Sequence, residues 1–106
     1  MASRVKRAQR PEGEIFPLSA AGAGDIGVIV RVGSESDLES LSRTELERRL
    51  LEMGFVEGAR IKVLHEGFIG RDPIAVQLDD MRVALRRREA ADVMVQSLSS
   101  DQADLA

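Results

Sequence analysis

The chain has 106 residues, 43% hydrophobic and 31% charged, a composition that supports one domain with a buried core. It has no cysteine and a single histidine, which excludes disulfides, thiolate metal sites and a multi-histidine metal site within one chain. A net charge of -3 and an aromatic content of 3% argue against a protein that coats nucleic acid or stacks bases on aromatic rings. No apolar run approaches the length of a membrane span or follows the basic N-terminus as in a secretory signal, so we expect a cytoplasmic location.

The two ends of the chain are polar. The N-terminal end carries Pro11 and Gly13 among several basic residues, and the C-terminal end is rich in Ser, Asp and Ala. Because neither end can bury much apolar surface, we expect a flexible basic tail at 1–14, a folded domain at 15–96 and a flexible tail at 97–106.

The first part of the domain predicts a strand followed by a helix. Residues 27–32 form a β-branched run bounded by glycines, which is typical of a strand. Residues 44–53 predict a helix that Ser42 or Thr44 caps and that Gly54 ends in a left-handed conformation. The apolar residues at the spacing of one helical face, which should pack on the core, are Leu46, Leu50 and Met53.

The second part of the domain predicts short strands joined by turns. Three alternating runs indicate strands at 60–66, 73–78 and 82–86, and Asp79-Asp80 has the spacing of a hairpin turn. Glu89 to Val95 predicts a short helical turn with Ala90, Val93 and Met94 facing the core. The pattern favours a mainly β fold: a small barrel with one inserted helix and a short C-terminal helical turn.

Most motifs that suggest chemistry fit a structural role better. Residues 22–27 match G-x-G-x-x-G by letter, but a dinucleotide fingerprint follows a strand and opens a helix, whereas here a strand follows the glycines. His65 has no cysteine or serine motif to act on, and Asp79 with Asp80 supplies too few oxygens for a calcium loop. We therefore predict no catalytic residue, no metal ligand and no cofactor.

Three places on the chain are candidates for contact with a partner. Phe68 and Ile69 lie between glycines at the expected tip of a hairpin, where they either fold back over the core or form an exposed apolar contact. Arg86 and Arg88 either form a solvated strand edge or bind an acidic or phosphate-bearing partner. Leu51 lies off the apolar stripe of the helix and is expected to border the same surface.

The chain resembles the ferrous iron transport protein A (FeoA) family. The resemblance is carried, in order, by residues 18–30, by the run LLEMGFVEGARIKVL at 50–64, and by 72–76 and 83–90. The residues of this pattern that we expect to be structural are Leu50, Met53, Gly54, Gly58, Pro73 and Leu85. The sequence departs from the family where Arg71 separates Gly70 from Asp72, where Asp80-Met81 replaces a glycine–aromatic pair, and in a long stretch at 33–42.

The resemblance implies an SH3-like barrel and a non-enzymatic accessory of ferrous iron uptake. FeoA proteins are small cytoplasmic proteins that work with FeoB, a membrane protein that carries a G domain and transports Fe²⁺. The implied partner is thus the cytoplasmic portion of an FeoB-type transporter, whose activity the protein would modulate. We expect no nucleic-acid partner and contact with the membrane only through that partner, and we leave weak self-association open.

A second interpretation comes from another class of protein. The same SH3-like module forms the C-terminal domain of iron-dependent repressors, so the chain could instead be a regulatory module that binds a proline-rich or apolar peptide. The absence of a helix-turn-helix upstream favours the transport accessory. An arginine supplied in trans can assist GTP hydrolysis, but we do not expect that role for Arg86 to Arg88.

Overall fold

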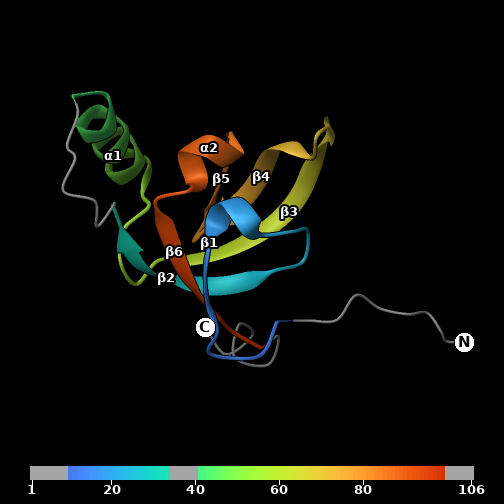
Figure 1. Ribbon diagram of the computed structural model, residues 1–106. Helices are drawn as coiled ribbons and strands as arrows, with labels where there is room; N and C mark the ends of the chain where they lie inside the picture. Colours follow the sequence, from blue (N-terminus) through green and yellow to red (C-terminus); the bar gives the residue numbers. More distant parts are fainter. Residues whose placement is uncertain (1–9, 34–40, 100–106) are drawn as a thin grey trace, which may run out of the picture.

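The computed structural model describes residues 10–33 and 41–99, with side chains from Thr44 onward in the second range. One antiparallel sheet of six strands curls around a single core (Figure 1). The strands are β1 (Ile15–Pro17), β2 (Ile26–Val32), β3 (Arg60–Ile69), β4 (Asp72–Leu78), β5 (Met81–Leu85) and β6 (Val93–Ser97). The helical elements are η1 (Leu18–Ala20), a 3-10 turn, α1 (Leu41–Met53) and α2 (Arg87–Ala90). The prediction of a mainly β fold is confirmed.

The two edges of the sheet meet through helical turns. The strand order β1-β6-β2-β3-β4-β5 leaves β1 at one edge and β5 at the other. η1 directly follows β1, α2 follows β5, and these two turns pack against each other (Figure 1). The sheet is therefore a small open barrel whose gap is covered by η1 and α2.

The core lies inside the curl of the sheet. Alternate residues of β3, β4 and β6 are buried, as expected for strands with one face on a core and one in solvent. The buried hydrophobic residues are Phe16, Leu18, Ala21, Ile29, Leu50, Phe55, Ala59, Ile61, Val63, Ile74, Val76, Leu78, Leu85, Ala90, Val93 and Val95.

The helix α1 packs on the barrel through its predicted apolar stripe. Leu50 is fully buried, and Leu46 and Met53 are half-buried against the core. Gly54 follows the helix with a φ of 108° and donates its N–H to the carbonyl of Leu51 at 3.0 Å.

The start of α1 differs from the prediction. The helix begins at Leu41, so Thr44 lies inside the helix and is not its N-cap, while the side chain of Ser42 lies outside the described residues. A cap cannot be located from residue type alone when several serine and threonine residues stand close together.

The predicted helical turn at 89–95 is only partly correct. The helix α2 ends at Ala90, and Val93 begins the strand β6, which pairs with both β1 and β2. Val93 is buried as expected, but Met94 is half-buried on the opposite face of the strand. The spacing of Ala90, Val93 and Met94 imitates a helical face, whereas the alternation of buried positions is that of a strand.

Both ends of the described chain contact the barrel. Gly13 donates its N–H to Ser97 at 2.9 Å, and Ser97 donates to the carbonyl of Glu14 at 2.8 Å. The guanidinium of Arg10 lies 3.9 Å from the centre of the Phe16 ring. Composition places these terminal residues in the tails, but here Ser97 is the last residue of β6, and Gly13 and Glu14 hydrogen-bond to it just before β1 begins. The rest of both expected tails (1–9 and 100–106) and most of the long stretch at 33–42 (34–40) lie outside the described residues.

Candidate partner-binding surface

The most exposed apolar side chains lie at the tip of the β3–β4 hairpin. Ile69 pairs with Asp72, which leaves Gly70 and Arg71 as a two-residue turn. Both turn residues have positive φ, 67° for Gly70 and 60° for Arg71, as a type I′ hairpin turn requires. The extra residue noted in the sequence, Arg71, thus occupies the second position of this turn.

Phe68 and Ile69 project from this tip into solvent. Their relative exposures are 104% and 86%, so neither covers the core. The sequence left open whether these two side chains fold back over the core or are exposed, and in the structure they are exposed. Gly67 precedes them at a point where β3 and β4 run so close that a β-carbon would collide with the carbonyl of Asp72.

Arg87 holds the outer part of the hairpin to the rest of the barrel. Its guanidinium donates to the carbonyls of Ser19 and Ala21 at 2.9 and 2.8 Å, and to that of Arg71 at 2.8 Å. It also forms an ion pair with Glu66 at 2.9 Å. The planar fork of an arginine can serve these acceptors together, so one side chain joins η1, β3 and the hairpin turn.

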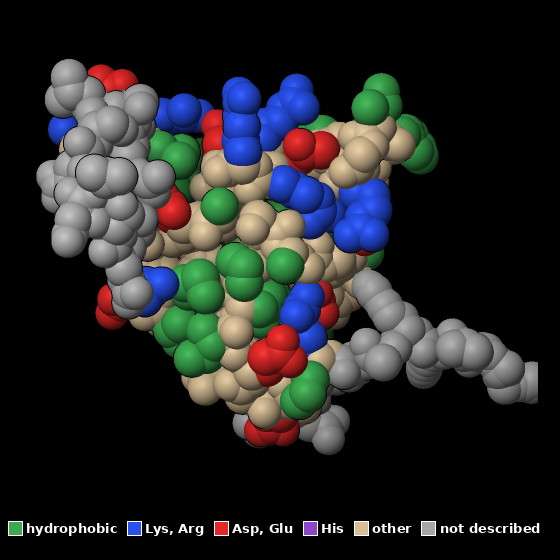
Figure 2. All heavy atoms as spheres, viewed as in Figure 1, with side chains coloured by type: hydrophobic (Ala, Val, Ile, Leu, Met, Phe, Trp, Pro, Cys, Tyr) green, Lys and Arg blue, Asp and Glu red, His purple; other side chains and the backbone are tan. Residues whose placement is uncertain are grey.

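The basic side chains Arg86 and Arg88 lie next to this network. Both are exposed, whereas Arg87 between them is mostly buried. The backbone N–H of Arg87 donates to Asp72 at 2.8 Å, which places the start of α2 beside the hairpin. Figure 2 shows Lys and Arg side chains gathered over α2 and along the hairpin, with hydrophobic side chains at the hairpin's end.

Leu51 does not belong to the same surface. It is half exposed in the last turn of α1, and α1 lies on the opposite side of the molecule from the hairpin tip (Figure 1). The structure therefore brings Phe68, Ile69, Arg86 and Arg88 together but leaves Leu51 apart from them.

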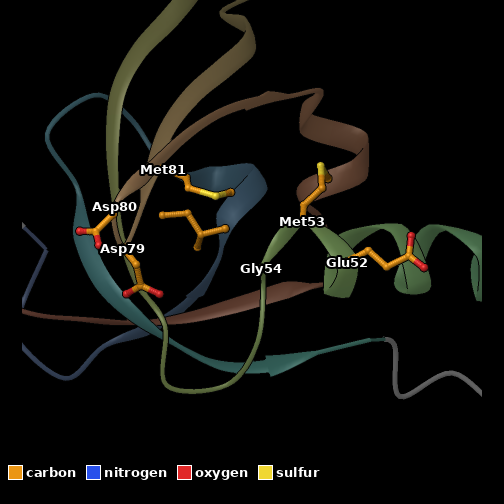
Figure 3. A pocket seen from close by; sticks show the side chains of 7 residues that line it. Glu52, Met53, Gly54, Asp79, Asp80 and Met81 are labelled. Carbon is orange, nitrogen blue, oxygen red and sulfur yellow. The ribbon is translucent and has the colours of Figure 1, made fainter.

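A groove of about 360 Å³ lies near the C-terminal end of α1, beside the turn between β4 and β5 (Figure 3). Its apolar lining includes Leu78 and Met81, the residue that stands where the family has an aromatic side chain. Its other lining residues are Glu52, Met53, Gly54, Asp79 and Asp80. The sequence did not reveal this groove, because its two walls are far apart along the chain.

The motifs that suggested chemistry take the structural roles expected of them. Gly24, with a φ of 95°, lies in a turn that leads into β2, and Gly22 donates its N–H to the Asp25 carboxylate at 2.8 Å. Asp79 forms the β4–β5 turn with a φ of 52°, and His65 is exposed on β3. Within residues 10–33 and 44–99, no group of three or more His, Cys, Asp or Glu side chains is placed to hold a metal ion.

The structural motif residues are divided between the core and the turns, with Leu50, Met53 and Leu85 in or against the core. Leu85 is buried at the end of β5, and Pro73 is the second residue of β4. Gly58 adopts a φ of 90° and donates its N–H to Ile29 at 2.8 Å, which attaches the turn before β3 to β2. No helix of the described chain is long and apolar enough to cross a membrane.

Comparison with known proteins gives a family. The FeoA domain family matches residues 16–97. The fusion protein of Fe²⁺ transport protein A and Fe²⁺ transporter FeoB from Porphyromonas gingivalis is 39% identical over 84 residues. These residues are 79% of this chain but only 9% of that relative.

Solved structures agree with this assignment. FeoA of Stenotrophomonas maltophilia, described as a prokaryotic SH3 domain protein and solved with zinc, is 31% identical with a TM-score of 0.61, over 76% of this chain and 89% of that one. A manganese-dependent transcriptional repressor is 26% identical with a TM-score of 0.65, over 85% of this chain and 45% of the repressor. The barrel has the SH3-like fold, and the chain belongs to the FeoA domain family.

Proposed function

We propose that the protein is a non-enzymatic cytoplasmic accessory of ferrous iron uptake, which docks on the cytoplasmic portion of an FeoB-type transporter and modulates Fe²⁺ transport. The observation that carries the proposal is the relative in which an FeoA part and an FeoB part form one chain. A covalent link keeps two domains at high effective concentration. Where the accessory is a separate chain, a binding surface has to replace that link.

The hairpin tip is the surface best suited to such docking. Phe68 and Ile69 offer apolar area, and the exposed Arg86 and Arg88 add positive charge at α2, on one side of the hairpin. Buried apolar and arginine side chains dominate the energetics of many interfaces. Leu51 would form a separate, second contact on α1.

Binding to membranes that contain the transporter tests this proposal. We expect saturable binding of the full chain to membranes with the FeoB-type transporter, in excess of that to the same membranes without it. The double variant Phe68→Ser/Ile69→Ser should bind at least about tenfold more weakly. The matched control Ile15→Ser/Val56→Ser removes two apolar side chains that are about half exposed elsewhere and should bind as the wild type does. Equal binding with and without the transporter would contradict the proposal.

A second candidate is the regulatory peptide-binding module, which the likeness to the manganese-dependent repressor favours. The groove beside α1 would hold the peptide, with Leu78 and Met81 against its apolar residues (Figure 3). Titration with proline-rich and apolar peptides distinguishes the two functions. Peptide binding that Met81→Glu abolishes, without any binding to the transporter, would favour the regulatory module.

A further inference from the structure

We infer that the β3–β4 hairpin tip is a lipid anchor: Phe68 and Ile69 enter the interface of an anionic bilayer while Arg71, Arg86 and Arg88 bind lipid phosphates. This goes beyond the proposed function, in which the same tip contacts the transporter: here its partner is the lipid around the transporter. It rests on that function only for its setting, a transporter embedded in a membrane.

The two apolar side chains suit a partner that surrounds the tip. Phe68 and Ile69 are successive residues at the end of β3, where the pairing with β4 is irregular between Glu66 and Ile69. Both are almost fully exposed, so neither is sheltered by the barrel on any side. A flat protein surface would cover only part of such side chains, whereas the interfacial region of a bilayer surrounds them.

The exposed charged side chains of this group are basic, although one of them, Arg71, is paired with Glu66. Arg71, Arg86 and Arg88 are exposed. The neighbouring carboxylates are partly buried and hydrogen-bonded within the barrel. Glu66 pairs with Arg87 and Arg71, Asp72 accepts from the N–H of Arg87, and Glu89 accepts from that of Arg86.

This arrangement gives a chain of net charge -3 a basic end. Arginine forks match phosphate oxygens, and basic side chains near an anionic leaflet add to apolar insertion. The positive charge and the exposed apolar side chains therefore both favour an anionic bilayer as the partner of this end of the molecule.

The backbone of the tip is also attached to the barrel. Arg87 hydrogen-bonds to the turn carbonyl of Arg71 at 2.8 Å, and the close approach at Gly67 fixes the two strands just before the tip. A contact that is already ordered loses little conformational freedom on binding. Two apolar residues and three arginines suit weak, reversible attachment, which would concentrate the protein at the membrane where its partner resides.

Fluorescence provides a direct test because the chain contains no Trp or Tyr. Phe68→Trp places a single reporter at the tip, and Ile15→Trp places a control reporter at a half-exposed position on β1. With vesicles of phosphatidylcholine and phosphatidylglycerol, we expect a blue shift for Phe68→Trp and none for Ile15→Trp. Pure phosphatidylcholine vesicles, or high salt, should reduce the shift, because exposed charge interactions are screened.

Co-sedimentation of the full chain with the same vesicles tests the contributing residues. We expect Phe68→Ser/Ile69→Ser to lower binding about tenfold, Arg86→Ala/Arg88→Ala to lower it severalfold, and Ile15→Ser/Val56→Ser to leave it unchanged. No binding to anionic vesicles, or undiminished binding of the tip variant, would overturn the inference.

The inference and the proposed function fail in different ways. If the tip contacts protein instead, vesicles stay unbound while the tip variant loses binding to the isolated cytoplasmic portion of the transporter. If the proposed function is wrong but the anchor exists, the protein binds anionic vesicles and the transporter adds nothing to that binding.

Discussion

The guanidinium of Arg87 lies 2.9 Å from Oε1 of Glu66, and both side chains are mostly buried between α2 and β3. The other oxygen of Glu66 accepts the backbone N–H of Ala23 at 2.9 Å. This ion pair therefore connects the turn before β2, the hairpin and the helix that covers the gap of the barrel, and it supports the surface proposed to bind a partner.

Loss of the Arg87 side chain should destabilise the barrel. Arg87→Ala leaves Glu66 without this partner and removes the donor to the carbonyls of Ser19 and Ala21. Hydrogen bonds to charged groups contribute about 1.5–3 kcal/mol each, so we expect a loss of at least about 2 kcal/mol in urea unfolding. Arg87→Lys should recover only part of it, since an ammonium cannot serve the same acceptors. The exposed neighbour gives the control: Arg88→Ala should change little, and equal effects of the two alanine variants would contradict this account.

Leu50→Ala should unfold or strongly destabilise the domain. Leu50 is fully buried beneath α1, and truncation of a buried leucine costs about 2–5 kcal/mol, a large part of the stability of a small domain. Its neighbour Leu51 is half exposed, so Leu51→Ala should melt within a few degrees of the wild type. Thermal melts followed by circular dichroism measure both. A normal melt for Leu50→Ala would show that the buried face of the helix is assigned wrongly.

Two glycines of the hairpin should respond differently to alanine. Gly67→Ala forces a β-carbon into the backbone of Asp72, so β3 and β4 must separate near the tip. In Gly70→Ala the new β-carbon has no neighbouring atom to collide with. Only the positive φ of this residue destabilises the folded state, by about 1 kcal/mol. We expect Gly67→Ala to lower the melting temperature more and to speed amide exchange at the base of the hairpin. The reverse order would contradict the described strand spacing.

Phe68→Ser/Ile69→Ser should leave folding nearly intact. Because both side chains are exposed, their removal takes almost no apolar contact from the core. The melting temperature should stay within a few degrees of the wild type, whereas a loss of 1 kcal/mol would shift a domain of this size by about 4–8 °C. A large drop would mean that the tip packs on the barrel, and binding defects of this variant could then not be assigned to the surface.

The isolated chain should bind Fe²⁺ weakly. The described residues hold no cluster of three or more metal-ligating side chains, and the chain has no cysteine and one histidine, the exposed His65. Anaerobic calorimetry should show no stoichiometric binding tighter than about micromolar. A one-to-one isotherm in the submicromolar range that persists in His65→Ala would contradict this prediction.

The sequence predicted the elements whose signals are local. The alternation in β4, the leucine stripe of α1 and the aspartates of the β4–β5 turn each act within a few residues, and the structure has all three. The strand β6 was missed because its first residues, Val93 and Met94, extend a pattern that also fits a helix. The three-residue strand β1 is too short to show a period and depends on its pairing with β6.

The candidate surface could be predicted only in part. Phe68 and Ile69 stand out between glycines, yet only the folded hairpin decides whether they are covered or exposed. Strand alternation predicted Arg86 and Arg88 as contact residues and gave no role to Arg87. In the structure, Arg87 is the residue that hydrogen-bonds to the hairpin and to the segment around η1. No local pattern could have identified it, because its acceptors at Ser19 and Glu66 are brought to it by the closing of the barrel.

Fe²⁺ flux into proteoliposomes that contain the FeoB-type transporter tests the central claim most directly. Adding the full chain on the side of the G domain should change the initial rate of Fe²⁺ uptake in a saturable way, and the control Ile15→Ser/Val56→Ser should do the same. Phe68→Ser/Ile69→Ser should require about tenfold more protein for the same effect. An uptake rate that stays the same at every concentration of the folded wild-type protein would contradict the account.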